Sequence, residues 1–147
     1  MQLFAGIADY THTEFEGPGV VGTVFSNEGY ETRLEAIQRE QNGWSAAYGV
    51  QLRRRKFSAI GEEAFVPPAT TQQLGAYMFH EIELGNVHLE GAARFESTDH
   101  ENKTTGQERS FDLFSLSGGG DIHVTDSVRF GGTVFRTERA PTTEELF

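Results

Sequence analysis

The sequence predicts an all-β chain whose strands, about seven in number, run antiparallel and up-and-down as an open section of a transmembrane β-barrel. Stretches in which apolar and polar residues alternate recur along the whole chain. The connections between them are long at 14–22, 58–70, 97–107 and in the tail from Glu138, and short at 40–43, 85–86 and 123–126. Outer-membrane barrels show this asymmetry, because their periplasmic turns are tight and their outer loops are long.

The first two predicted strands, 2–14 and 30–36, differ in how clearly their faces separate. In the first, Leu3 and Ile7 share one side but Phe4 and Tyr10 lie on the other, so neither face is assigned. In the second, the even positions are mostly apolar, and the odd positions 31, 33 and 35 carry charges. A strand face with charges two residues apart requires water or other charged strands beside it.

The third predicted strand, 44–56, separates its two faces most clearly. Its even positions are apolar from Trp44 to Leu52 and then turn basic at Arg54 and Lys56. Eight steps of about 3.3 Å, reduced by a tilt of about 40°, give an apolar height of roughly 20 Å, which suits a membrane-spanning strand.

The remaining strands are predicted at 74–84, 87–96, 110–122 and 128–134. His80 interrupts the apolar face of the fourth strand near its short-turn end, whereas the fifth alternates without interruption. Asn42-Gly43 and Gly85-Asn86 are favourable tight-turn dipeptides. The glycines of 117–121 are interpreted as strand residues, because no helix or lysine follows as a phosphate loop requires.

Composition excludes several classes of protein. With 147 residues, a net charge of −10 and a pI near 4.9, the chain is a single domain that lacks the basic surface of a nucleic-acid-binding protein. No apolar run approaches the roughly 18 residues of a spanning helix. Catalytic motifs and cysteine nucleophiles are absent from the sequence, so we expect neither an enzyme nor a bound cofactor. The first residues do not form a secretory signal, so the chain is either cytoplasmic or an incomplete piece of an exported protein.

The alternation of apolar and polar positions alone leaves two interpretations open. In a self-contained soluble β-barrel or sandwich, which would bind a small apolar ligand or a protein partner, the apolar face points inward. In a membrane barrel the polarity is inverted. Seven strands do not close a bacterial barrel, which needs an even number, so we expect the chain to stop before the pattern is complete and to leave two open sheet edges.

The carboxy-terminal string RAPTTEELF, residues 139–147, resembles a signature of TonB-dependent outer-membrane receptors. The residues that carry this likeness are Arg139, Ala140, Pro141, Thr142, Glu145, Leu146 and Phe147. ADYTHTEFE (8–16), VGTVF (21–25), GEEAFVPP (61–68) and LEGAARFE (89–96) resemble the middle of the same family's barrel, in particular its proteobacterial branch with zinc-uptake receptors.

The resemblance implies a 22-stranded barrel in the bacterial outer membrane, filled by an amino-terminal plug, that takes up a scarce ligand such as a metal or metal chelate with energy passed through TonB. Residues 1–147 then form part of that barrel, without the signal peptide, the TonB-contacting box, the plug or most of the strands. We therefore expect ligand uptake to belong to the parent protein.

Three groups of candidate site residues follow from the faces of the strands. A lumen or plug-facing set comprises Glu31, Arg33, Glu35, Gln51, Arg53, His88, Glu90, Arg94 and Glu96. Arg54 and Lys56 would face lipid and pair with phosphates of lipopolysaccharide. Candidate metal ligands are His12 and Glu14 near the outer end of the first strand, and Asp99, His100 and Glu101 in a predicted long loop, because imidazole and carboxylate suit zinc.

Overall fold

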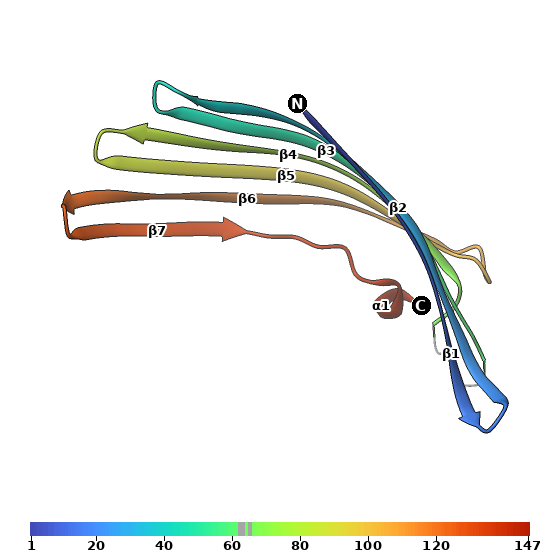
Figure 1. The fold of residues 1–147 in the computed structure, drawn as a ribbon. Coiled ribbons are helices and arrows are strands. Elements are labelled where there is room, and N and C mark those ends of the chain that lie inside the picture. The colour runs from blue at the N-terminus through green and yellow to red at the C-terminus, as the bar shows by residue number, and fades with distance from the viewer. Residues whose placement is uncertain (62–63, 65) are drawn as a thin grey trace.

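In the computed structural model, the chain forms one open sheet of seven antiparallel strands, each hydrogen-bonded to the next along the sequence (Figure 1). The structure describes residues 1–61, 64 and 66–147. The strands are β1 (Gln2–Gly17), β2 (Val20–Gln41), β3 (Trp44–Gly61), β4 (Ala69–Leu84), β5 (Val87–Asn102), β6 (Glu108–Thr125) and β7 (Val128–Arg136). This arrangement confirms the predicted all-β, up-and-down architecture. No α-helix among the described residues has the length and apolar character needed to cross a membrane.

The strands are longer than predicted, chiefly at the end of the long connections. β1 and β2 continue through most of the predicted connection 14–22 and turn at 18–19, where Gly19 has a positive φ of 78°. β5 continues to Asn102, so the predicted loop 97–107 shrinks to 103–107. Both predictions were wrong because ladder hydrogen bonds use backbone groups, and polar side chains therefore do not end a strand.

The other connections agree better with the predicted positions. Short turns join β2 to β3 at 42–43, β4 to β5 at 85–86 and β6 to β7 at 126–127. Asn42 and Gly43 both have positive φ, 55° and 77°, as a type I′ hairpin turn requires. β3 and β4 are joined through 62–68, and Glu62, Glu63 and Phe65 of the predicted loop lie outside the described residues.

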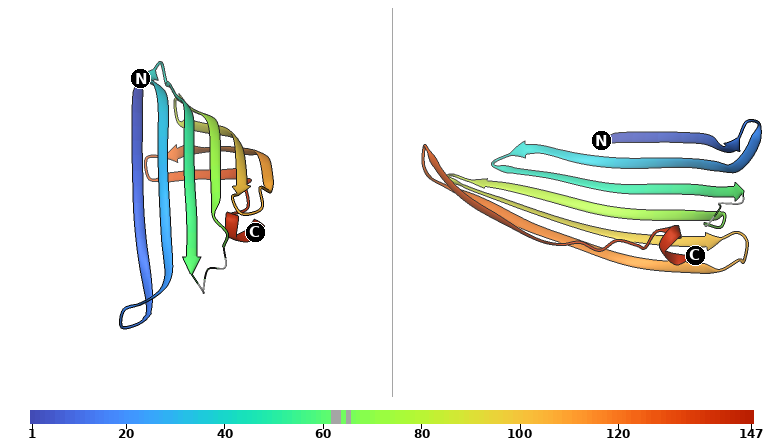
Figure 2. Two further views of the ribbon diagram at one scale, coloured as in Figure 1. Left: turned by 90° about the vertical axis from the view of Figure 1, so that its right-hand side faces the viewer. Right: turned by 90° about the horizontal axis from the view of Figure 1, so that it is seen from below.

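The sheet is curved (Figures 1 and 2). Its two faces differ in the side chains that they carry. Pairing in register places alternate residues of all strands on a common face. It also settles the first strand, because Leu3 and Ile7 share the convex face with Leu34 and Tyr30, whereas Phe4 and Tyr10 lie on the concave face.

The segment after Arg136 leaves the sheet and folds back against its concave face, where the short helix α1 (Thr143–Leu146) lies inside the curve (Figure 1). Residues 139–147, which belong to the predicted long connection from Glu138, form a coil and a helical turn. The Glu145 carboxylate accepts a hydrogen bond from the Thr142 backbone N–H at 2.7 Å and holds the start of the helix.

The described residues form no layered core. Among the described residues, the buried apolar positions are only Ala46, Ala59, Val66 and Ala69, whereas many large apolar side chains remain exposed. A single curved sheet leaves both faces open, so the distribution of side chains between these faces determines what each can contact.

Candidate functional site

The convex face carries a continuous band of exposed apolar side chains across all seven strands. Their exposed fractions range from 38% for Ile82 to 91% for Ile7. We call these residues the apolar band: Leu3, Ile7, Tyr30, Leu34, Trp44, Tyr48, Val50, Leu52, Leu74, Met78, Ile82, Leu89, Phe95, Phe114, Leu116, Ile122, Val128, Phe130 and Val134. A surface patch of this extent requires an apolar partner, either lipid or protein.

Aromatic side chains mark the short-turn end of the apolar band. The Trp44 indole N–H donates to His80 Nδ1 at 3.1 Å, and the two rings stack with their centroids 5.8 Å apart. Tyr48 Oη lies 3.2 Å from the other ring nitrogen of His80. These contacts explain the polar residue that interrupts the fourth strand, since both imidazole nitrogens are satisfied by aromatic neighbours.

The concave face carries most of the ion pairs and side-chain hydrogen bonds, and all of the residues predicted to line a lumen lie on it. Exposed apolar side chains also occur on this face, mainly on its outer strands, at Phe4, Tyr10, Ile37 and Phe135. In its centre, Tyr77 lies across Gly49 of the neighbouring strand and donates a short hydrogen bond to Glu35 two strands away. A Cβ at Gly49 would stand 2.2 Å from Tyr77 Cζ, so only glycine leaves room for this crossing.

Arg94 repeats this crossing one strand further along the sheet. Its guanidinium passes over Gly75, where a Cβ would lie 2.6 Å from Nη2, and donates to Gln51 Oε1 at 3.2 Å. The same group pairs with Glu96 at 2.5 Å, and Gln51 in turn donates to Glu31 at 2.7 Å. The side chains therefore lie flat along the sheet and satisfy one another.

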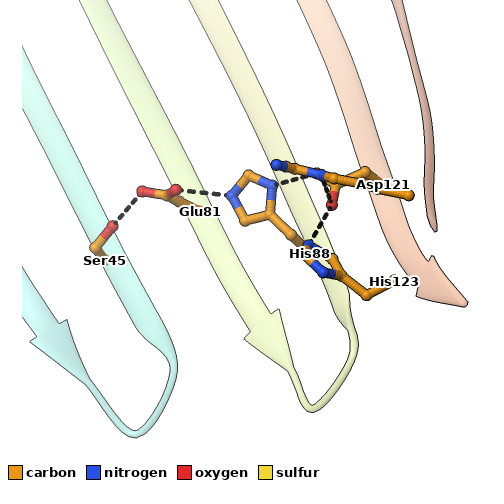
Figure 3. A network of polar contacts seen from close by, with 6 residues as sticks. Ser45, Glu81, His88, Asp121 and His123 are labelled. Carbon is orange, nitrogen blue, oxygen red and sulfur yellow. Dashed lines mark hydrogen bonds and ion pairs between the residues drawn. The ribbon is translucent and has the colours of Figure 1, made fainter. Parts of the chain in front are cut away.

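A second polar cluster lies near the short-turn end of the concave face (Figure 3). His88 Nε2 is 2.7 Å from Glu81 Oε1, and His88 Nδ1 is 3.1 Å from Asp121 Oδ2. Ser45 donates to Glu81 at 3.1 Å, and Arg129 donates to Asp121 from Nε at 2.5 Å. Since ionised carboxylates only accept hydrogen bonds, the imidazole bridges both of them only when both its nitrogens carry protons.

The tail is attached to the concave face at its beginning and folded by an ion pair. Glu138 accepts from the Phe114 backbone N–H at 2.9 Å, and its own N–H donates to Ser115 Oγ at 3.1 Å. Arg139 forms a two-pronged ion pair with Glu145, each contact at 2.9 Å. These bonds lower the pKa of the Glu145 carboxyl to about 2, chiefly through the hydrogen bonds from Arg139 and then through that from the Thr142 backbone.

The candidate metal ligands do not converge. Asp99, His100 and Glu101 belong to β5 rather than to a loop, and His100 lies on the opposite face of the sheet from its two acidic neighbours. His12 and Glu14 form a pair, with Nε2 and Oε1 3.6 Å apart. Within the described part of the chain, no group of three or more histidine, cysteine, aspartate or glutamate side chains is placed to hold a metal ion.

Arg54 and Lys56 lie on the convex face beyond Leu52, at the edge of the apolar band. Lys56 Nζ is 3.5 Å from the Glu28 carboxylate on the neighbouring strand. Their position agrees with the face that parity predicted, and contact with lipid phosphate stays a prediction.

Sequence reasoning missed several residues that carry the concave networks, notably Gln73, Tyr77, Glu81, Asp121 and Arg129. Gly49 and Gly75 were a possible signal, because a glycine within a well-formed strand often marks the close approach of a neighbouring group. Comparison of the chain with protein-family models and with curated proteins found no match.

Proposed function

We propose that the chain is a section of the wall of an outer-membrane transporter of the TonB-dependent type, whose full protein takes up a scarce ligand such as a metal or metal chelate. The observation that carries the proposal is the apolar band, which stands exposed on the convex face while ion pairs and amides occupy the concave face. A membrane barrel has this polarity, with lipid outside and a polar interior.

The dimensions and ends of the band support the same proposal. On β3 the band extends from Trp44 to Leu52, and eight steps of about 3.3 Å at a tilt of about 40° give roughly 20 Å, near the apolar thickness that barrels present to lipid. Trp44 and Tyr48 lie at its short-turn end, and Tyr30 lies beside Arg54 at the other. Aromatic and basic residues are typical of the two membrane–water boundaries.

The concave networks suit a surface that faces water or a plug domain. Most charges in the centre of this face are neutralised within the sheet, as in the contacts of Glu35 with Arg33 at 3.4 Å and of Arg94 with Glu96. A partner that slides against these paired groups has little charge of theirs to compensate. This fits a plug that must move or rearrange during uptake.

Trp44, the one tryptophan in the sequence, allows a direct test of the membrane contact. The chain is refolded into vesicles of ordinary or brominated phosphatidylcholine, and its fluorescence is compared. We expect bromine to quench Trp44 strongly, and to have little effect on a W44F variant that carries S117W, a concave position on β6. Equal quenching of the wild type and the W44F/S117W variant would refute the membrane assignment. So would a wild-type chain that is a stable water-soluble monomer without quenching.

Uptake is tested on the full reading frame in living cells. Cells with and without the frame are supplied with labelled zinc and with labelled iron chelates, each in the presence and absence of functional TonB. We expect uptake of at least one ligand to require both the frame and TonB. Uptake that does not depend on either would exclude the transport proposal while leaving the membrane contact intact.

A further inference from the structure

A small pocket of about 230 Å³ lies between the concave face and the tail, in the half of the sheet toward the long connections. Arg53, Arg55, Thr71, Gln73 and His100 form its sheet side, and Thr143 lies among the tail residues that cover it. His100 and Thr143 are each only 5% exposed. The tail thus turns an open part of the concave face into a partly covered pocket.

Most other charges around the pocket are already neutralised. Glu96 pairs with Arg94 and also accepts hydrogen bonds from Gln73 at 3.3 Å and Thr98 at 3.2 Å. Arg139 is bound at both prongs by Glu145. These groups contribute little net charge to the interior of the pocket.

Arg53 and Arg55, unlike these neutralised groups, bring uncompensated positive charge to the pocket. Within the described residues, neither guanidinium has a carboxylate within ion-pair distance. Arg55 is fixed in place, because its Nε donates to Asn27 at 2.7 Å and its guanidinium lies 5.2 Å from the centre of the Phe57 ring. Its terminal nitrogens make no side-chain hydrogen bond among the described residues and are left for another partner.

Glu144 is the acidic group of the tail that lines the pocket. The pKa of its carboxyl is lowered mainly by a hydrogen bond from its own backbone, then by hydrogen bonds from Thr142 and Thr143, and in the smallest part by the charge of Arg55. The carboxylate is therefore ionised at neutral pH and competes with any other anion for Arg55.

We propose that this pocket binds a compact oxyanion, namely the carboxylate or phosphate group of a small ligand, between Arg53 and Arg55. Guanidinium groups match the planar spacing of oxyanion oxygens and form charge-assisted hydrogen bonds to them. The Thr71 hydroxyl is hydrogen-bonded to His100 Nδ1 at 2.9 Å and the Gln73 amide to Glu96 at 3.3 Å, so the two arginines supply the donors for the anion. A volume of about 230 Å³ suits a small anion or one group of a larger ligand rather than a whole drug-sized molecule.

This binding site goes beyond the proposed function and does not depend on it, because all of its walls belong to the chain itself. If the chain is a transporter wall, the long connections lie on the outer side, and the pocket becomes a basic site on the route of an anionic ligand. Binding without membrane insertion and insertion without binding are separately measurable.

The test is a calorimetric titration of the full chain in uncharged detergent micelles with sodium phosphate and, separately, with sodium citrate. We expect saturable binding of at least one probe, weakened about tenfold or more by R53Q and by R55Q, since each removes a charge-assisted contact. R39Q is the control, because Arg39 is exposed and lies near the short-turn end of β2, away from the pocket. This variant should leave the affinity unchanged.

E144Q provides a test in the opposite direction. Removing the competing carboxylate should tighten binding of the same probe severalfold, and a gain in affinity cannot arise from misfolding. Wild-type protein that binds neither probe would overturn the proposal. Equal losses of affinity in R39Q and R53Q would also overturn it, because they indicate unspecific charge attraction. A loss of affinity in E144Q would overturn it as well.

Discussion

The phenol ring of Tyr77 lies directly over Gly49, with Cζ 2.2 Å from where a Cβ would stand, and through this gap Tyr77 reaches Glu35 across the whole width of β3. The contact ties three neighbouring strands by side chains in addition to their ladders. It depends on a missing side chain, and glycine is here a structural requirement of the network.

Replacing this glycine should uncouple the network. In G49A the new methyl group displaces the Tyr77 ring, and we expect a loss of about 1–3 kcal/mol of unfolding free energy, because the hydrogen bond to a charged acceptor is broken. G6A is the matched control, since a Cβ at Gly6 meets nothing within 4 Å. Urea unfolding of the micelle-bound proteins, followed by circular dichroism, measures both.

The double variant G49A with Y77F separates the two causes. If the loss in G49A comes from the displaced phenol, adding Y77F should cost little more, so the two changes should be clearly non-additive. Additive losses would show that Gly49 matters for the strand itself and not for Tyr77.

The carboxylate of Glu138 should control where the tail leaves the sheet. It accepts from the Phe114 backbone N–H, so E138A should expose that amide and speed its hydrogen exchange. Exchange of the Arg94 amide, in the middle of β5, serves as the internal reference. Unchanged protection of Phe114 in E138A would mean that the tail is held in place without this carboxylate.

The ion pair of the tail should resist acid. The pKa of Glu145 is lowered to about 2, so its stabilising contribution is fully present above the ordinary carboxyl value near 4.5 and is lost only as pH falls toward 2. Carbon-13 resonances of the Glu145 carboxyl, followed by NMR between pH 6 and about 1.5, should show this late titration. In R139Q the midpoint should rise toward its ordinary value. A wild-type midpoint near 4.5 would show that the ion pair does not persist in solution.

Alternation of residue types was sufficient to predict that seven strands exist and, in the strands with a clear pattern, which residues share a face. From Val87 to Phe95 the odd positions are apolar or glycine and the even positions are polar except for Ala92, and the structure assigns these residues to the faces that alternation indicates. For the first strand the pattern was ambiguous, and only pairing of Ile7 with Tyr30 in β2 resolves it. The two faces of a strand are determined by the sequence of that strand alone, because successive side chains point to opposite sides, and sequence periodicity therefore identifies them.

The contacts between strands could not be predicted in the same way. Glu35 and Tyr77 meet because the register of two ladders places both beside Gly49, and a shift of two residues in either ladder would separate them. The His88 cluster likewise depends on the pairing of β5 with β6. The tail fold depends on Glu138 and Glu145 capping backbone groups, which alternation of apolar residues does not record.

Two adjacent alanines offer the sharpest test of which face meets lipid. Ala93 lies on the convex face within the apolar band, between Leu89 and Phe95, whereas Ala92 lies on the concave face. An arginine at a lipid-facing position near the middle of the membrane costs roughly 2–4 kcal/mol, whereas lumen positions tolerate it. We therefore expect A93R to make folding into vesicles less favourable by about that amount and A92R to change the stability much less.

The same two variants also discriminate against a soluble fold. In a soluble barrel or sandwich the apolar face is the core, so A93R would also be destabilising, but the protein would then fold without lipid or detergent. The decisive measurement is folding of the wild type and both variants with and without vesicles, followed by circular dichroism and Trp44 emission. Folding that requires vesicles and is impaired by A93R alone supports a membrane wall. Similar penalties for A92R and A93R would mean that neither face is set apart by lipid, and the apolar band would need a protein partner instead.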